Sequence, residues 1–546
     1  MNRRLFLKRS TAALLAAKAG RALALSAPPD RAPEFKTANA RWQAAYDSAL
    51  AVLAGNVQVL PRYNGPVLIE GSVYAGIWME GGPHENLVYR KFRPDVARNA
   101  HFTFFELQRE DGQFPATNKV RYGDAGRSPV DDDRRYQSSQ VGFAQIQMVV
   151  PIAATAWELA RATGDEQLLH AAYNACSRWD DWLMRYRNTR GTGLIEGVCT
   201  FDTGYDNSPR WAGIPDRCPD GDAKEFPPIP SLPRLCPDLS ATVYGARTAL
   251  AAMAKAMGKS ADADRWTESA QKIRSLILGR LYVPEDAAFY DLDAQNHFVK
   301  IRTELITRVC SEHIPDQALF DELWTRQIHN PKAFWSAYPL PSIALDDPAF
   351  VRPIPRNSWG GAAQALTVLR AGRWLDHYGR SAEFAHWMNR WCEAIQRDPT
   401  LRQQVDPLDG DFTQQDAPNY SPSALIMVDS TWRLAGVHEE PDALHWNVRP
   451  GHPAAESARF RMRTDAGPGT VAQDAEMRYD KRGAELFLGS KPIGRIDSGT
   501  VRLITSKTGV PQALLGIDEQ PRKCTIRLTG HPAREFTVGS NQRIAL

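Results

Sequence analysis

Hydrophobic positions from about residue 143 onward recur at helical spacing and come in pairs separated by short polar breaks. The first such face is formed by Val149, Ile152, Ala153 and Ala156, which follow the i, i+3, i+4, i+7 spacing of an amphipathic helix. A Thr-Gly-Asp break at 163–165 then precedes a second apolar face. The same pattern returns around the breaks at 258–260 and 379–381. The pattern therefore predicts a series of helical hairpins.

Each break places Gly where one helix ends and a polar residue where the next begins. Glycine adopts the left-handed conformation cheaply, and Ser or Asp accepts a hydrogen bond from the first free N–H groups. Short breaks make neighbouring helices antiparallel. The hairpins are joined by long loops at irregular intervals, which favours a closed ring of hairpins over a regular solenoid. These loops cover about 56–90, 110–138, 188–238, 283–312, 330–358 and 397–420.

The pattern changes to alternation near Gly436. Three apolar residues, Ala458, Phe460 and Met462, alternate with arginines, as in a strand with one buried face. Further strands are expected at 501–505, 524–529 and 536–538, with a hairpin over 476–488. The residues from 437 to 546 are therefore predicted to form a small β-sandwich domain that caps a helical domain over 28–436.

The first residues resemble an export signal. The basic sequence Arg3-Arg4-Leu5-Phe6-Leu7-Lys8 precedes a weakly apolar run that ends in small residues near 27. This order is typical of a twin-arginine signal peptide over 1–27, and a basic amphipathic helix is the alternative. No later segment reaches the ~20 apolar residues that span a bilayer. We therefore expect a mature protein that is periplasmic or secreted, with no membrane partner once the signal is removed.

Composition narrows the function classes. The chain has 546 residues, 43% hydrophobic and 24% charged, with a net charge of +3, which does not favour a nucleic-acid partner. The sequence has no glycine-rich phosphate loop and no Cys/His cluster at zinc spacing, so we expect no cofactor and no metal. Of the seven cysteines, Cys176 and Cys392 lie on apolar helix faces. Two of Cys199, Cys218 and Cys236 could pair after export. The oligomeric state is not indicated.

One segment carries the strongest chemical signal. Residues 204–211 read Gly-Tyr-Asp-Asn-Ser-Pro-Arg-Trp and place the carboxyl group of Asp206 in a turn beside an amide, a guanidinium and two aromatic rings. Rings cover apolar sugar faces, amides and guanidinium groups bind hydroxyls, and a carboxylic acid can protonate a glycosidic oxygen. The alternative is a purely structural turn capped by Asp206, with Arg210 as its ion-pair partner.

With four further segments, residues 204–211 resemble the six-hairpin (α/α) barrel glycosidases related to trehalase, the processing α-glucosidases and mannosylglycerate hydrolase. The likeness covers about 135–436. The resemblance implies a mainly α fold, an (α/α)6 barrel with the small C-terminal β-sandwich. The four further segments are Asp238-Leu239-Ser240-Ala241 with Tyr244, Tyr338-Pro339-Leu340-Pro341-Ser342, Asn357-Ser358-Trp359-Gly360-Gly361, and Asp406-Pro407-Leu408-Asp409-Gly410 with Tyr420-Ser421-Pro422-Ser423-Ala424.

The resemblance makes Asp206 the general acid but leaves the general base open. The family's base is a glutamate whose position here is taken by Gln403, and the arginine of the family's Trp-Arg-Gly is replaced by Gly360. An amide cannot accept a proton from water. An inverting hydrolase needs a second carboxylate about 6.5–9.5 Å from the acid. The replacements in the same loop are Asp406, Asp409, Asp411 and Asp416.

A further candidate base is Glu80, which lies among glycines in the segment Trp-Met-Glu-Gly-Gly-Pro at 78–83. Glu80 is the first choice and Asp411 the second. An exposed loop acid is the alternative for Glu80, and a turn or cap is the alternative for each aspartate. The pocket wall is expected to contain Trp78, Gln137, Asn207, Arg210, Trp211 and Trp359.

These observations predict an exported glycoside hydrolase that acts on an oligosaccharide or glycoside by inverting general acid–base catalysis. Two other classes stay open. One is a carbohydrate-binding protein that kept the scaffold without the base. The other is a lyase, phosphorylase or epimerase on the same barrel. The sugar, its anomer and the linkage are not indicated.

Overall fold

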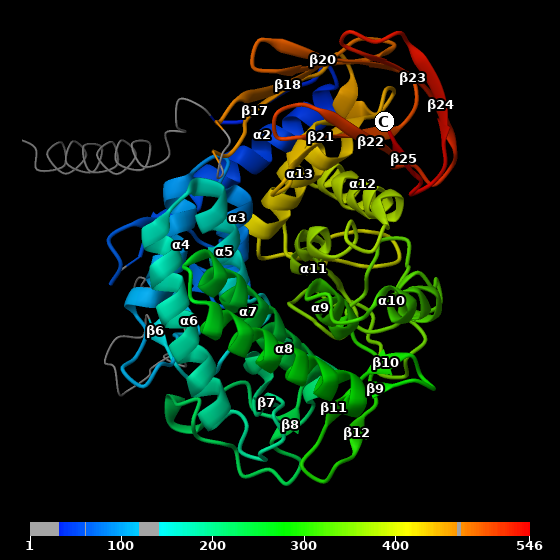
Figure 1. Cartoon of the computed structure of the whole chain (residues 1–546). Coiled ribbons are helices and arrows are strands. Elements are labelled where there is room, and N and C mark those ends of the chain that lie inside the picture. The colour runs from blue at the N-terminus through cyan, green and yellow to red at the C-terminus, as the bar shows by residue number, and fades with distance from the viewer. Residues whose placement is uncertain (1–31, 61, 120–140, 467–470) are drawn as a thin grey trace, which may run out of the picture.

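The computed structural model describes residues 32–60, 62–119, 141–466 and 471–546, and Figure 1 shows a mainly helical chain that ends in β-sheets. The predicted signal peptide over 1–27 and the predicted pocket residue Gln137 lie outside the described residues. The mainly helical class and the strands of the C-terminal region are confirmed. Among the described residues, none of the helices has the length and apolar character that a membrane span requires.

The first helices lie inside the predicted helical domain over 28–436 but before residue 143, where the regular hairpin pattern begins. The structure has helices before residue 143, and short helices also interrupt two of the predicted loops. The helices are α2 (Ala40–Gly55), α3 (Gly82–Tyr89), α4 (Pro94–Glu106), α5 (Ile152–Thr163), α6 (Glu166–Tyr186), α7 (Pro237–Ala256), α8 (Ser260–Arg280), α9 (Leu305–Ser311), α10 (Gln317–Leu323), α11 (Ala365–Arg370), α12 (Ser381–Arg397) and α13 (Ser421–Ala435). Short turns of helix are η2 (Thr200–Asp202), η3 (Pro209–Trp211), η4 (Pro219–Gly221), η5 (Trp324–Ile328), η6 (Ala371–Arg373) and η7 (Pro453–Ala455).

The helix breaks follow the predicted chemistry in part. Gly164 ends α5 in the left-handed conformation at φ 68°, and the side chain of Asp165 accepts a hydrogen bond from the N–H of Leu168 at the start of α6. The prediction is wrong for the two serines. Ser260 and Ser381 are the first residues inside their helices. The capping position is the residue before each of them, so neither serine caps its helix.

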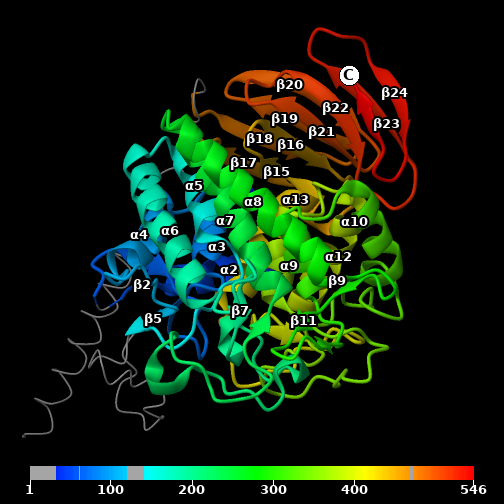
Figure 2. The ribbon, with the colours of Figure 1, turned by 60° about the horizontal axis from the view of Figure 1, so that its bottom comes forward.

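Contacts between helices run in a continuous circuit. The helices α3, α5, α7 and α9 touch in sequence order, η6 links α9 to α11, and α13 touches both α11 and α3. The helices α4, α6 and α8 lie on the outer side of this circuit, and α2 packs on α13 (Figure 1). In Figure 2 the C-terminal sheets lie on one side of the helices, and the short strands β5, β7 and β11 lie toward the other side.

The C-terminal region consists of two antiparallel sheets. They contact one another through β15 with β17 and β18, through β16 with β19, and through β22 with β24. The seven-stranded sheet contains β1 (Glu34–Lys36), β17 (Arg459–Arg463), β18 (Asp474–Tyr479), β19 (Gly483–Leu488), β20 (Lys491–Asp497), β23 (Arg522–Leu528) and β24 (Arg534–Val538). The five-stranded sheet contains β15 (Val437–Glu439), β16 (Ala443–Val448), β21 (Val501–Ser506), β22 (Pro511–Gly516) and β25 (Arg543–Ala545). The sequence pattern did not indicate that β1, from the other end of the chain, pairs with β17.

Strand β17 has the predicted alternation, with Phe460 and Met462 buried and the arginines at its surface. The remaining short strands brace the long loops in small sheets. They are β2 (Val57–Val59) with β3 (Pro66–Leu68); β4 (Gly76–Trp78), β5 (Thr117–Lys119) and β6 (Val141–Gly142); β7 (Glu196–Gly197), β8 (Arg234–Leu235), β11 (Asp291–Leu292) and β12 (Phe298–Val299); β9 (Tyr282–Val283) with β10 (Ala288–Phe289); and β13 (Ala363–Gln364) with β14 (Gln404–Val405).

Candidate active site

The long loops converge on a polar cavity of about 180 Å³. Its carboxyl groups come from Glu70, Glu80 and Asp206, and its rings include Tyr74 and Trp78. Strand β4 fixes the position of Trp78, because its backbone is paired with β5. The other lining side chains used below are Gln147, Asn357, Trp359 and Gln403.

Asp206 lies on a loop whose backbone conformation is tightly determined. Gly204 and Asn207, on either side, both have positive φ values, 66° and 57°. The carbonyl oxygen of Asp206 accepts a hydrogen bond from the N–H of Trp359 at 3.0 Å, and its Oδ2 accepts one from Asn357 Nδ2 at 2.6 Å. Burial, followed by the nearby charge of Glu80, raises the pKa of Asp206 to about 8. The carboxyl group is therefore protonated at neutral pH, as a general acid requires.

Glu80 lies against the same loop. A Cβ atom on Gly204 would overlap Glu80 Oε2, so a larger residue at that position would displace the carboxyl group. Glu80 Oε2 accepts a hydrogen bond from Gln147 Nε2 at 3.2 Å, and Oε1 forms an ion pair with Arg370 at 3.3 Å. The cavity is thus lined by the carboxyl group of Asp206, whose pKa is raised, and by the ion-paired carboxyl group of Glu80.

Two further acids of this region were not singled out from the sequence. Glu70 lines the cavity, and its Oε1 accepts a hydrogen bond from the Tyr420 hydroxyl at 2.5 Å. Burial raises the pKa of Glu70 well above its ordinary value, and the charges of Glu85 and Glu80 act in the same direction. Burial also raises the pKa of Glu85, in α3, to about 8. Both residues belong to the first predicted loop, but nothing local to either distinguishes it from an exposed acid.

Gln403, which the resemblance led us to compare with the base of related enzymes, lines the cavity and belongs to a chain of hydrogen bonds that ends at Asp206. The hydroxyl of Tyr74 donates to Gln403 Oε1 at 2.8 Å, and Gln403 Nε2 donates to Asn357 Oδ1 at 3.2 Å. Asn357 in turn donates to the carboxyl group of Asp206. The amide group of Gln403 therefore orients Asn357, which in turn holds the carboxyl group of Asp206.

The structure brings together only part of the predicted pocket wall. Trp78 and Trp359 line the cavity. Asn207 is exposed and donates from Nδ2 to the carbonyl oxygen of Asn357 at 2.9 Å. Asp411 has a side chain that is 78% exposed and pairs with Arg397 at 3.7 Å, so the loop turns it toward solvent. The other aspartates of that loop do not line the cavity either, and two of them, Asp406 and Asp409, pair with Arg352.

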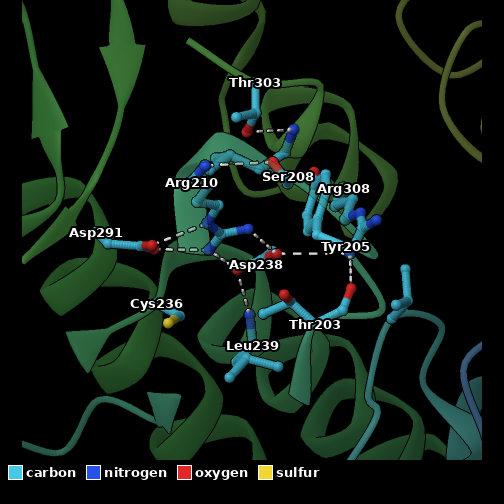
Figure 3. A network of polar contacts seen from close by, with 12 residues as sticks. Thr203, Tyr205, Ser208, Arg210, Cys236, Asp238, Leu239, Asp291, Thr303 and Arg308 are labelled. Carbon is cyan, nitrogen blue, oxygen red and sulfur yellow. Dashed lines mark hydrogen bonds and ion pairs between the residues drawn. The ribbon is translucent and has the colours of Figure 1, made fainter. Parts of the chain in front are cut away.

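Arg210 and Trp211 are buried and do not line the cavity. Figure 3 shows Arg210 between Asp238 and Asp291. Arg210 is not the ion-pair partner of Asp206. Its guanidinium group bonds to both oxygens of Asp238, at 2.7 and 2.8 Å, and to both oxygens of Asp291, at 2.6 and 2.8 Å. Trp211 donates from its indole nitrogen to Thr203. These contacts fasten the Asp206 loop to α7 and β11.

A second arginine completes this buried support. Arg308, from α9, lies with its guanidinium carbon 3.9 Å from the ring centre of Tyr205 and donates to the carbonyl oxygen of Thr203 at 2.6 Å. The Tyr205 hydroxyl donates to Glu304 at 2.7 Å. The residues next to Asp206 are therefore held by fully buried polar contacts, which fix the position of the carboxyl group.

In the part of the chain that the structure describes, three groups of side chains have the spacing of metal ligands, and none of their members lines the cavity. In each group at least one carboxylate is already paired with an arginine: Asp202 with Arg187, Asp238 and Asp291 with Arg210, and Asp376 with Arg502. The arrangement in the cavity is suited to proton transfer by carboxyl groups.

The sequence matches the family model described as the mannosylglycerate hydrolase MGH1-like glycoside hydrolase domain over residues 74–423. A comparison with curated proteins gives no significant match. Among solved structures, the chain is similar to the GH63 mannosylglycerate hydrolase from Thermus thermophilus, with 18% identity, 70% of this chain and 99% of that chain covered, and a TM-score of 0.57.

Two other solved structures share the fold at lower identity. The GH78 rhamnosidase of Bacillus sp. GL1 is 11% identical over 83% of this chain and 41% of that chain, with a TM-score of 0.55. The neutral trehalase of Saccharomyces cerevisiae is 13% identical over 67% of this chain and 73% of that chain, with a TM-score of 0.50. The family match covers more than half of the chain and includes Asp206 and Glu80. The chain therefore belongs to the mannosylglycerate hydrolase MGH1-like family of glycoside hydrolases.

Proposed function

We propose that this glycoside hydrolase is exported and cleaves its substrate with inversion, with Asp206 as the general acid and Glu80 as the general base. The observation that carries the proposal is a pair of carboxyl groups at one cavity, one with a raised pKa and the other ion-paired with an arginine. Asp206 has a pKa of about 8 and carries a proton at neutral pH, whereas Glu80 forms an ion pair with Arg370. Such a pair divides the acid and base roles as inverting hydrolysis requires.

The reaction follows from this arrangement. Asp206 donates its proton to the glycosidic oxygen as the bond to the anomeric carbon breaks. Glu80 accepts a proton from a water molecule that attacks the opposite face of the sugar ring. The rings of Trp78 and Trp359 offer apolar surfaces to the sugar. The circuit of helix contacts supports an (α/α)6 barrel as the scaffold that holds the loops.

The stereochemical outcome tests this function. The mature protein is incubated with a panel of oligosaccharides and aryl glycosides of both anomers, and the first product is followed by proton NMR before mutarotation. We expect the product to have the anomeric configuration opposite to that of the substrate. Retention of configuration would instead require a carboxylate nucleophile and would contradict the assignment of Glu80.

One observation favours a second candidate, a carbohydrate-binding protein without turnover. The family's base position is occupied by Gln403, which cannot accept a proton. That candidate predicts saturable binding of a sugar in calorimetry together with no product from any substrate of the panel. Product formation at a rate that depends on Asp206 would exclude it.

Export is tested separately. Replacing Arg3 and Arg4 with Lys should leave a reporter fusion in the cytoplasm, because twin-arginine export depends on that pair. The measurement is the periplasmic share of the reporter, with the unaltered fusion as the control. An undiminished periplasmic share would count against twin-arginine export.

A further inference from the structure

Two buried thiols flank the segment that carries Asp206. Cys199 directly precedes η2, Cys218 directly precedes η4, and their Sγ atoms lie 3.7 Å apart. A disulfide has a sulfur–sulfur length of about 2.05 Å, so a modest approach of the two side chains would join them. Cys236, the third cysteine of this region, instead contacts the carbonyl oxygen of Arg234 through its sulfur at 3.5 Å.

Cys199 and Cys218 also form a potential metal site with Asp202, but the bonds of Asp202 argue against that use. Its two oxygens accept hydrogen bonds from the guanidinium group of Arg187 at 2.5 and 3.1 Å. They also accept bonds from the backbone N–H groups of Ile146, Val198 and Cys199. A carboxylate with this many donors has no oxygen to offer a cation, so the two sulfurs are left to react with one another.

We propose that Cys199 and Cys218 form a disulfide bond. The bond closes residues 199–218 into a ring that contains Asp206. The bond forms by thiol–disulfide exchange with a disulfide oxidant, either a protein or a small molecule. One cysteine thiolate attacks the oxidant and releases its first thiol. The second cysteine thiolate then attacks the mixed disulfide and releases the second thiol. Two protons and two electrons pass from the cysteines to the oxidant.

The surroundings of the pair decide when the bond can form and how it behaves. Both thiols are buried, and burial raises the pKa of Cys199 well above its ordinary value. Because the thiolate is the reactive form and both thiols are buried, exchange in the folded protein is slow and needs a transient local opening of the segment. Once formed, the bond is shielded from external reductants for the same reason.

The bond would tie together two points that the fold already holds close. The N–H of Cys218 donates to the carbonyl oxygen of Ala144 at 2.9 Å, and Arg187 Nη2 lies 3.5 Å from Cys218 Sγ. Closing the ring restricts the unfolded chain, which stabilises the folded segment. We expect a rise of a few degrees in the temperature at which the enzyme is inactivated.

The test uses the full chain, folded either with a mixture of oxidised and reduced glutathione or with reduced glutathione alone. Each sample is denatured, its free thiols are alkylated, and its proteolytic peptides are mapped by mass spectrometry. We expect the oxidised sample to keep five of its seven thiols and to yield one linked peptide pair containing Cys199 and Cys218. Seven free thiols in both samples, or a link through Cys236, would overturn the proposal.

Two variants and a matched control extend the test. Cys199→Ser and Cys218→Ser should each abolish the linked peptide and remove the difference in inactivation temperature between the two samples. Cys236→Ser removes a buried thiol of the same region. This variant should keep the linked peptide and the difference in inactivation temperature between the two samples. The peptide map of the unaltered protein decides the question even if a variant fails to fold. Because the readout is the bond itself, this result is independent of the proposed catalytic roles.

Discussion

Replacing Asp206 with Asn lowers the turnover of a glycoside with a poor leaving group by about 10²–10⁴-fold, the usual contribution of general acid catalysis. The amide has nearly the same shape as the carboxyl group but carries no transferable acid proton. The loop should keep its conformation, because its supports are the backbone bond to Trp359 and the buried contacts of Arg210 and Arg308. The measurement is kcat on a natural oligosaccharide or an alkyl glycoside.

The leaving group provides the internal control for this variant. An activated aryl glycoside needs little protonation as its bond breaks, so Asp206→Asn should slow it much less than the alkyl glycoside. The pH profile gives a second control. Activity of the unaltered enzyme should fall as the pH rises through about 8, because Asp206 then loses its proton, and the variant should lack this decline. Small and equal losses on both substrates would show that Asp206 is not the acid.

Replacing Glu80 with Ala abolishes hydrolysis of both kinds of substrate, a loss of at least about 10²-fold. The attacking water must be activated whatever the leaving group is. The loss of turnover should therefore be as large for the activated substrate as for the other. Added azide should restore part of the turnover, because it is a nucleophile that needs no base and can enter the space that the side chain leaves. Turnover with and without azide, and the configuration of the glycosyl azide, are the measurements.

Asp411→Ala is the matched comparison for the Glu80 variant. Both changes remove a carboxylate from a long loop, but Asp411 is exposed and paired with Arg397, so hydrolysis should persist. If Asp411→Ala loses hydrolysis and Glu80→Ala keeps it, Asp411 rather than Glu80 is the general base. If both variants hydrolyse normally, neither residue is the base, and Glu70 becomes the next carboxyl group of the cavity to replace.

The features that the sequence revealed are those whose signal is local. Asp206 could be singled out because its amide, proline and aromatic neighbours are contiguous in the chain, and Glu80 because glycines and a tryptophan surround it. Helix α6 and strand β17 were predictable because one face of each is buried, which produces a regular period. In contrast, α3 is buried on nearly every side, so its residues show no apolar stripe that would indicate a helix.

The features that escaped prediction depend on partners far away in the chain. Arg210 has a type of side chain that often binds sugar hydroxyls. Its actual partners, Asp238 and Asp291, lie 28 and 81 residues further along the chain. Glu70 differs from an ordinary loop acid only through burial and through Tyr420, 350 residues away. Strand β1 joins the sheet formed by the opposite end of the chain. Such pairings are set by the folded arrangement, and no local pattern encodes them.

The buried carboxyl groups around the cavity also set a limit on the resistance of the fold to alkali. In the unfolded chain an Asp or Glu ionises near pH 4, whereas burial raises the pKa values of Asp206 and Glu85 to about 8 and also raises that of Glu70. The folded state therefore binds these protons more tightly than the unfolded state. Their contribution to stability is complete below about pH 4 and is lost as the pH rises through about 8. The desolvation that equips Asp206 to donate a proton thus weakens the protein in alkaline surroundings.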